Sequence, residues 1–319
     1  MGEVPDPQPG LDEIRVQVKT CAVCRTDLHL AEGDLAPKRF GVVPGHEIVG
    51  VVDRAGANCR RFHLGDRVGI AWLASTCGRC RFCIAGRENL CLDPRFTGWD
   101  QDGGYATYAV VKEAFAYALP PGFDDETAAP LLCAGIIGYR ALKRSEVPPG
   151  GRLGLYGFGA SAHLALQVAL STGSEVHVMT RSPKARQLAL SLGASSARDL
   201  SKAPPVPLDA SVVFAPAGSV VLSALEATER GGTVVVAGIH LSPIGNLDYD
   251  KHLFQERQVR SVTANTRQDG EEFLAIAQRI RLQLSTIPYR FGEADRALSD
   301  LAHGRVQGAA VVHISDGQI

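Results

Sequence analysis

The sequence predicts an α/β protein with two domains, one β-rich and one built as a doubly wound α/β sheet. Three observations predict this fold class. The chain has 319 residues, which is long enough for two domains. Apolar and polar residues alternate over 12–20, the pattern of a half-buried strand. After Gly151, a short apolar strand runs into a glycine turn and then a helical pattern, as in a parallel sheet covered by helices.

The β-rich domain is expected over residues 1–133. Strands are predicted at 12–20, 47–53 and 67–72, the last entered through the Gly65-Asp66 turn. Frequent glycines and little helical periodicity separate these strands. The segment therefore reads as a compact β structure.

Composition restricts the possible partners. The formal net charge is −1, so electrostatics do not favour nucleic acid or an anionic membrane as a partner. No apolar run approaches the ~18 residues that span a bilayer, and the N-terminus lacks the features of a secretion signal. We therefore expect a cytoplasmic protein with no nucleic-acid and no membrane partner.

Four cysteines lie close together within this domain. They are Cys77, Cys80, Cys83 and Cys91. In a reducing compartment, clustered cysteines indicate a metal site rather than a disulfide framework. Four thiolates make a closed structural zinc site. The alternative is an iron–sulfur cluster, but the last gap of seven residues and the Leu-Asp that follows differ from the ferredoxin spacing.

A second set of metal-binding residue types lies upstream. Cys24 is followed by His46 and Glu47, which supply a thiolate, an imidazole and a carboxylate. These three groups are of the types that bind Zn²⁺ in proteins. A catalytic zinc has three protein ligands and one open position, whereas a structural zinc has four protein ligands. Thr26 and His29 lie between them and could form a proton path.

A glycine turn opens the second domain. Its fingerprint residues are Gly157, Phe158, Gly159, Ala160, Ser161 and Ala162. A G-x-G-x-x-[G/A] turn between strand and helix lets backbone approach a pyrophosphate that faces the helix N-terminus. The alternative is a glycine turn without a ligand.

Alternating elements follow this turn. They are a helix at 163–170, a strand at 175–180, a helix at 184–192, and strands at 210–215 and 233–238. We expect a Rossmann dinucleotide-binding domain over 134–264. A helix at 271–281 and a closing strand at 309–314 then return the chain to the first domain, which takes 265–319 as its second part.

The residues at the end of the second strand of this domain predict whether NAD(H) or NADP(H) is preferred. NAD-specific domains carry an acid there that binds the ribose hydroxyls. Here the residues are Thr180, Arg181, Ser182 and Lys184, which offer donors to a 2′-phosphate. NADP(H) is therefore favoured over NAD(H). Alternatively, Arg181 is a solvated helix-entry residue and NAD still binds.

The chain carries these motifs in order, together with Cys133-Ala134-Gly135. This set resembles the zinc-dependent alcohol dehydrogenases of the medium-chain dehydrogenase/reductase superfamily. The resemblance covers nearly the whole chain. It implies a GroES-like catalytic domain with an inserted nucleotide-binding domain, and an active site in the cleft between them. It also implies two zinc ions per chain, one catalytic and one structural.

The resemblance assigns roles to the residues of the first metal set. Cys24, His46 and Cys133 match ligands of the catalytic zinc, and Glu47 matches a carboxylate beside the metal that exchanges with water. Without its Cys-Ala-Gly context, Cys133 would read as a core thiol. Asp27 matches the acid that orients the ligand histidine.

Further residues are assigned to the proton relay, the cofactor and the substrate. Thr26 and His29 match the proton relay, although His29 could also be a surface histidine. Trp72 matches a bulky pocket residue that narrows the site toward small primary alcohols, with core packing as the alternative. Residues expected to bind the cofactor outside the glycine turn and the second strand are Arg25, Gly238, Ile239 and Asn265.

The implied function is a zinc-dependent alcohol dehydrogenase or aldehyde reductase that acts on a small-molecule primary alcohol or aldehyde, as a homodimer or homotetramer. A polyol or cinnamyl-type dehydrogenase is an alternative. A dinucleotide-binding sensor with little turnover is another, because Ile137 and Ala309 stand where relatives often have Thr and Arg. Arg25 or Arg267 could replace that Arg.

The start of the chain also departs from the family pattern. Relatives usually carry further residues before a segment like Val4-Pro5-Asp6-Pro7. We therefore expect either a missing segment or an open edge of the β-rich domain that is exposed to unwanted pairing.

Overall fold

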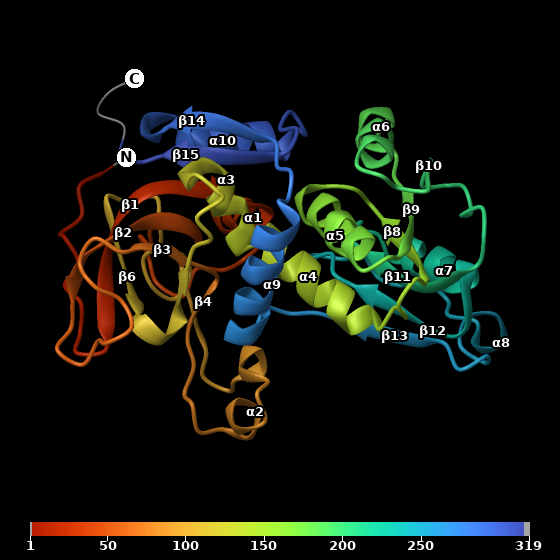
Figure 1. Cartoon of the computed structure of the whole chain (residues 1–319), viewed down its shortest axis with the longest axis horizontal. Helices are drawn as coiled ribbons and strands as arrows, with labels where there is room; N and C mark the ends of the chain where they lie inside the picture. The colour runs from red at the N-terminus through yellow and green to blue at the C-terminus, as the bar shows by residue number, and fades with distance from the viewer. Residues whose placement is uncertain (1, 316–319) are drawn as a thin grey trace. The chain divides into compact units, whose positions relative to one another are not determined.

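The computed structural model describes residues 2–315, and the chain divides into two compact units. The first unit comprises Met1–Ile136 and Ala264–Ile319, and the second comprises Ile137–Thr263. Figure 1 shows strands and helices in both. The described residues contain no helix that is long and apolar enough to cross a membrane.

A mixed sheet forms the centre of the first unit. Its strand order is β14-β15-β1-β2-β3-β7, with β6 also paired to β1. The pairs are antiparallel except for β14 and β15, which run parallel. The strands are β1 (Glu13–Val23), β2 (Glu47–Ala55), β3 (Arg67–Ile70), β6 (Tyr108–Lys112), β7 (Ala116–Ala118), β14 (Thr286–Arg290) and β15 (Ala309–His313).

The alternation predicted over 12–20 explains the position of β1 in this sheet. Ile14, Val16 and Val18 have no exposed surface and form the core with residues of the neighbouring strands. Residues two apart share one face of a strand, so one row of apolar side chains is buried together. The sequence-based prediction of this strand is confirmed.

Helices and a small second sheet complete the first unit. The helices are α1 (Arg25–Glu32), α2 (Arg81–Ile84), α3 (Asp125–Ala128), α9 (Arg267–Ile280) and α10 (Ala294–Ala302). The 3₁₀ turns are η1 (Glu88–Leu90), η2 (Glu113–Phe115), η3 (Ala129–Leu132) and η4 (Phe291–Glu293). The small sheet pairs β4 (Leu73–Ser75) with β5 (Arg95–Phe96). Helix α4 (Ala134–Ser145) carries the chain into the second unit.

The second unit is a six-stranded parallel sheet with order β10-β9-β8-β11-β12-β13. Its strands are β8 (Arg152–Tyr156), β9 (Glu175–Met179), β10 (Ser196–Arg198), β11 (Leu208–Val213), β12 (Thr228–Val236) and β13 (Gln258–Ser261). Its helices are α5 (Ala160–Ser171), α6 (Pro183–Ser191), α7 (Gly218–Ala227) and α8 (Tyr249–His252). Counted within the unit, the strand order is 3-2-1-4-5-6, that of a Rossmann domain. The predicted fold class is confirmed.

Several element boundaries differ from the sequence-based expectation, and two of these differences have a clear local cause. The strand expected over 67–72 ends at Ile70. The next two carbonyls accept hydrogen bonds from Thr97 instead of from a neighbouring strand: the Thr97 Oγ1 donates to the Ala71 carbonyl and its N–H donates to the Trp72 carbonyl. The helix expected from Glu271 begins at Arg267. Thr266 and Asp269 form a capping box there, a sequence signal that the helical periodicity alone does not include.

Candidate metal and cofactor sites

Four potential metal ligands converge in the first unit. The sulfur atoms of Cys24 and Cys133, a ring nitrogen of His46 and a carboxylate oxygen of Glu47 all lie within 4.8 Å of one another. The Cys24 Sγ is 3.2 Å from His46 Nε2. His46 and Glu47 are only 1% and 2% exposed. The structure thus brings together the four residues that the sequence proposed as one site.

Strand register explains this convergence. Ala22 of β1 pairs with Glu47, the first residue of β2. The chain leaves β1 just beyond this pair, so Cys24 arrives beside His46 and Glu47 although 22 residues separate it from His46. Cys133 follows the 3₁₀ turn η3, whose residues are all buried.

The first turn of α1 holds two of these groups in place. Cys24 is the N-cap of α1, and its sulfur accepts a hydrogen bond from the Thr26 N–H at 3.2 Å. Asp27 closes a capping box, because its Oδ2 accepts from the Cys24 N–H at 2.9 Å. The Asp27 Oδ1 lies 3.2 Å from both the Gly45 N–H nitrogen and His46 Nδ1. The helix cap therefore also orients the imidazole.

The electrostatics of this site fit a divalent cation. A hydrogen bond from the Cys133 thiol holds the pKa of Cys24 well below its usual value, and the same bond raises the pKa of Cys133. Burial and the nearby Cys24 anion raise the pKa of Glu47. Burial alone would lower the pKa of His46, but the charges of Cys24 and Asp27 raise it well above its usual value. A cation would stabilise the deprotonated donors, and two thiolates, an imidazole and a carboxylate suit Zn²⁺.

Thr26 and His29 lie on the helix that begins at this site. They are three residues apart and therefore share one face of α1, and both are half-buried. His29 Nδ1 lies 3.0 Å from Asp34 Oδ2. Sequence reasoning missed Asp34, which falls just after the helix. Arg25 is exposed in the first turn.

Trp72 contacts the metal-binding residues. Its ring meets the His46 ring edge-on, with centroids 4.9 Å apart and planes at 71°. Trp72 also stacks on Phe96, at 4.9 Å, and on Trp99, at 6.0 Å. Phe96 and Trp99 carried no motif signal in the sequence, because they are brought to Trp72 by loops and the short β4–β5 pair.

The four-cysteine loop forms a second convergent set. The sulfur atoms of Cys77, Cys80, Cys83 and Cys91 lie within 4.8 Å of one another. Backbone N–H groups of Cys83 and Leu92 lower the pKa of Cys80 to about 6, whereas burial raises that of Cys91 to about 11. Four sulfur donors in this arrangement fit a closed structural zinc site.

Glu88, within this loop, accepts hydrogen bonds from the backbone N–H and the guanidinium of Arg267. Arg267 was one of two residues considered for the cofactor phosphates. Its guanidinium is engaged with Glu88 instead. Sequence reasoning missed this pair because 179 residues separate its members.

The glycine fingerprint lies where β8 ends and α5 begins. Gly157 has φ +87°, and a Cβ there would lie 2.9 Å from the Ala215 backbone nitrogen, so only glycine fits. Gly159 is the N-cap of α5. Because glycine has no side chain, no side-chain hydrogen bond caps the first N–H groups of this helix. An added Cβ at Gly159 would meet open space, so a ligand can approach the backbone. The turn continues into the helix through the remaining fingerprint residues, Phe158, Ala160, Ser161 and Ala162.

The predicted phosphate-binding residues follow β9 in the same unit. Thr180 is buried, and Arg181 and Lys184 are exposed. Ser182 is the N-cap of α6, and its hydroxyl accepts from the Ala185 N–H at 3.3 Å. Arg181 and Lys184 are therefore the two exposed cations among these residues.

The remaining predicted residues are dispersed. Gly238 and Ile239 follow β12, and Ile239 is 48% exposed. Asn265 is buried in the first unit, where its amide donates to the Tyr117 hydroxyl at 3.2 Å. Ala309 is buried in β15, and Ile137 lies in α4.

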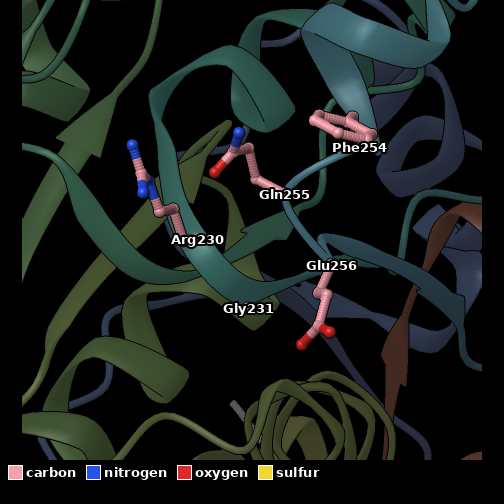
Figure 2. A pocket seen from close by; sticks show the side chains of 5 residues that line it. All are labelled: Arg230, Gly231, Phe254, Gln255 and Glu256. Carbon is pink, nitrogen blue, oxygen red and sulfur yellow. The ribbon is translucent and has the colours of Figure 1, made fainter.

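A surface hollow in the second unit contains none of the predicted site residues. It lies between the start of β12 and the segment before β13 (Figure 2). Its lining residues are Arg230, Gly231, Phe254, Gln255 and Glu256. Figure 2 shows the Glu256 side chain pointing away from the other labelled side chains, so no ligand-binding set converges there.

Two family models match the chain. The model described as "Alcohol dehydrogenase GroES-like domain" matches residues 10–121, and the one described as "Zinc-binding dehydrogenase" matches residues 162–279.

Relatives match over almost the full chain. A "Probable alcohol dehydrogenase AdhA" of Mycobacterium tuberculosis is 58% identical over 313 residues, which cover 97% of this chain and 90% of that protein. An alcohol dehydrogenase of Geobacillus stearothermophilus is 33% identical, with 98% and 95% covered. Among solved structures, a cinnamyl alcohol dehydrogenase of Sorghum bicolor has a TM-score of 0.91 at 27% identity, covering 99% of this chain and 94% of that chain.

Proposed function

This chain belongs to the zinc-dependent alcohol dehydrogenase family of the medium-chain dehydrogenase/reductase superfamily, and from that premise we propose its reaction and site residues. The reaction is hydride transfer between a nicotinamide cofactor and a primary alcohol or aldehyde. The convergence of Cys24, His46, Glu47 and Cys133 within 4.8 Å carries this proposal.

Cys24, His46 and Cys133 are the proposed ligands of a catalytic zinc, with Glu47 beside them. Bound Zn²⁺ supplies Lewis-acid chemistry that favours loss of the alcohol proton in one direction and polarises the carbonyl in the other. Glu47 is a fourth donor whose displacement leaves room for the substrate oxygen. Asp27 fixes the ring of His46 through its position 3.2 Å from Nδ1.

Thr26, His29 and Asp34 are the proposed proton path. The Thr26 hydroxyl would accept the proton of the alcohol while giving up its own proton toward His29, which would pass a proton outward. Asp34 is 54% exposed in its side chain and lies 3.0 Å from His29 Nδ1, so it connects the imidazole to solvent. This proposed path would follow α1 through Thr26 and His29 and end at Asp34, just after the helix.

The four-cysteine loop is proposed to hold a second, structural zinc. Its ligands are Cys77, Cys80, Cys83 and Cys91. Only the very short helix α2 and turn η1 lie among these residues, so metal ligation would contribute much of the local stability.

The second unit is proposed to bind the nicotinamide cofactor, with its pyrophosphate at the N-terminus of α5 and NADP(H) preferred over NAD(H). Exposed Arg181 and Lys184 support that preference, because no acid stands at the end of β9 to repel a 2′-phosphate. Arg25, Gly238, Ile239 and Asn265 remain proposed cofactor-binding residues.

Trp72 is the proposed wall of the substrate pocket. Its contact with the His46 ring supports this role, because it would set an aromatic wall next to the proposed metal site. The stack of Trp72, Phe96 and Trp99 also supports the second candidate, a cinnamyl-type dehydrogenase, because aromatic substrates pack well against such rings. A homodimer or homotetramer in the cytoplasm completes the proposal.

One set of measurements on the purified protein tests this function. Zinc content and reduction rates are measured with small aliphatic and cinnamyl-type aldehydes, each with NADPH and with NADH. We expect two zinc ions per chain and turnover with at least one aldehyde. Tight cofactor binding without any aldehyde reduction would instead support the sensor, and a protein that holds no zinc would overturn the catalytic site.

A further inference from the structure

Tyr105 reaches the metal-binding residues from a separate part of the first unit. It lies in the segment between β5 and β6 and is far in sequence from the Cys24 and His46 motifs. Its hydroxyl lies 3.3 Å from Asp27 Oδ2, to which it donates a hydrogen bond. It is thus a further polar contact to the carboxylate that orients His46.

The contacts of Asp27 show what this hydroxyl adds. Oδ1 faces the Gly45 N–H and His46 Nδ1, and Oδ2 faces the Cys24 N–H and the Tyr105 hydroxyl. Each carboxylate oxygen therefore lies next to two polar groups, and the one near Oδ1 that matters most is His46 Nδ1, at 3.2 Å. Burial and the charge of Asp27 raise the pKa of Tyr105 well above its usual value, so the hydroxyl keeps its proton and donates.

The tyrosine ring also supports the turn that precedes His46. Gly45 has φ +96°, and a Cβ there would lie 2.8 Å from Tyr105 Cδ1 and 2.9 Å from Cys21 Sγ. The ring is therefore packed against the Gly45 backbone, with no room for a side chain. Since Gly45 directly precedes His46, this packing fixes where the imidazole leaves the chain.

Backbone hydrogen bonds join the same two segments. The N–H groups of Gly103, Gly104 and Tyr105 donate to the carbonyls of Val43, Gly45 and Pro44, at 2.8, 2.9 and 3.0 Å respectively. The segment that carries Tyr105 is therefore fixed to the segment that carries His46, which leaves the hydroxyl little freedom to move away from Asp27.

We propose that Tyr105 is a positioning residue for the metal ligand His46, acting through its hydrogen bond to Asp27 and its packing on Gly45. The inference rests on the proposed zinc site of Cys24, His46 and Cys133. Without the hydroxyl, the Asp27 carboxylate can rotate away from His46, and the imidazole is held less firmly toward the metal. Changes in the groups around metal ligands typically cost about 10–100-fold in metal affinity, and we expect about 10-fold here.

The test compares Tyr105→Phe with Tyr289→Phe in the full-length zinc-loaded protein. Tyr289 is a matched control, because it is 7% exposed in the same unit and its hydroxyl donates to Asp300 at 2.9 Å. Each substitution removes one tyrosine–carboxylate hydrogen bond and keeps the ring. Two readouts are followed, zinc transfer to a chromogenic chelator and the visible spectrum after exchange of the catalytic metal for Co²⁺.

We expect one zinc per chain to leave about 10-fold faster in Tyr105→Phe, with a changed Co²⁺ spectrum. Tyr289→Phe should match the parent in both readouts, whatever its effect on melting temperature. The same zinc-release rate and Co²⁺ spectrum in Tyr105→Phe and the parent would overturn the proposal. Equal acceleration by both substitutions would also overturn it, because that indicates a general loss of stability.

Two further variants separate this inference from the proposed function. In Asp27→Ala, the addition of Tyr105→Phe should not accelerate zinc release further, because both act through one carboxylate. Additive effects would contradict that route. Cys24→Ser should remove one zinc per chain from the parent. If the zinc content of Cys24→Ser equals that of the parent, the proposed catalytic site is wrong, independently of the result for Tyr105→Phe.

Discussion

Arg267 binds Glu88 through two parallel hydrogen bonds, Nε to Oε1 at 3.0 Å and Nη2 to Oε2 at 2.7 Å, and its backbone N–H adds a third contact at 2.8 Å. Glu88 lies between the third and fourth cysteines of the metal-binding loop, and Arg267 is the first residue of α9. The bidentate pair therefore ties the four-cysteine loop to a helix of the first unit, and Figure 1 shows this loop, with α2, next to the N-terminal end of α9.

Glu88→Gln is expected to lower stability by about 1–2 kcal/mol, because a charged pair of hydrogen bonds is lost and Arg267 is partly exposed. A thermal unfolding scan measures this effect. Glu271→Gln is the control, because Glu271 forms a single exposed contact with Arg61 at 3.2 Å and should change stability much less. Equal effects of the two substitutions would show that the Glu88 pair is no stronger than a surface contact.

The dependence of this effect on pH provides a second check of the same prediction. Burial alone would raise the pKa of Glu88, but the hydrogen bonds from Arg267 outweigh it and the pKa is lowered. Its stabilising contribution is therefore present above the unfolded-state pKa of about 4.3 and is lost as the pH falls through the lower folded-state value. The difference between the parent and Glu88→Gln should be constant near neutral pH and shrink below about pH 4.

The two proposed zinc sites should be separable by mutation. Cys24→Ser is expected to abolish turnover and leave the fold intact, whereas Cys80→Ser should mainly lower thermal stability. The reason is that Cys24 belongs to the set beside the proposed proton path, and Cys80 to the closed set of four sulfurs. Metal analysis with activity and melting temperature tests this. One zinc per chain in fully active protein would contradict it.

Thr26→Ala should reduce turnover far more than His29→Gln. The Thr26 hydroxyl is proposed to touch the reacting oxygen, and general acid–base groups contribute about 10²–10⁴-fold. His29 only passes the proton on, and water can partly replace it because Asp34 and the helix end are open to solvent. Steady-state kinetics at saturating cofactor measure both variants. Similar losses in the two would argue against this order of proton transfer.

Arg181→Asp should shift the cofactor preference from NADPH toward NADH. Charged hydrogen bonds to a phosphate contribute about 1.5–3 kcal/mol, or roughly 10–150-fold in affinity. The ratio of kcat/KM for the two cofactors is the measurement, with Arg186→Gln as the control. Arg186 lies on α6, just after Arg181 in the chain, but it donates to the Thr180 carbonyl and pairs with Asp199. A parent that prefers NADH, or a ratio that Arg181→Asp leaves unchanged, would show that Arg181 does not select the cofactor.

Tyr156→Phe should stabilise the second unit. The Tyr156 side chain is 2% exposed, and its hydroxyl has no hydrogen-bond partner among the residues that the structure describes. A buried, unsatisfied hydroxyl costs about 1–3 kcal/mol, and its removal should recover about 1 kcal/mol while the ring still packs on Leu208 and Val213. Denaturant unfolding checks this gain. A loss of stability would mean that the hydroxyl has a partner in solution.

The two convergent donor sets were predictable from sequence because each proposed ligand belongs to a short motif of characteristic residue types. Cys24 and the His46-Glu47 pair could be proposed as one site before their strands were known, and the register of β1 and β2 then brought them together. The Rossmann unit was equally predictable, because its glycine turn and alternating strands and helices are local patterns.

The supporting residues could not be predicted in the same way. Tyr105, Phe96 and Trp99 lie outside any periodic pattern, and only loop packing brings them to Asp27 and Trp72. The pairing of Glu88 with Arg267 joins residues far apart in sequence, for which one sequence gives no signal. Sequence motifs therefore revealed the donors, and the structure was needed to show what holds them.

The position of Cys24 at the N-cap of α1 places two demands on a single atom. Its sulfur caps the N-terminus of the helix by accepting a hydrogen bond from the Thr26 N–H, and the same sulfur is a proposed metal donor. Serine or asparagine would cap the helix as well or better, but a hydroxyl or amide carbonyl oxygen is a poor substitute for a thiolate in a zinc site. Cysteine therefore meets both demands, as the cap of the helix that carries Thr26 and His29 and as a donor in the proposed metal site.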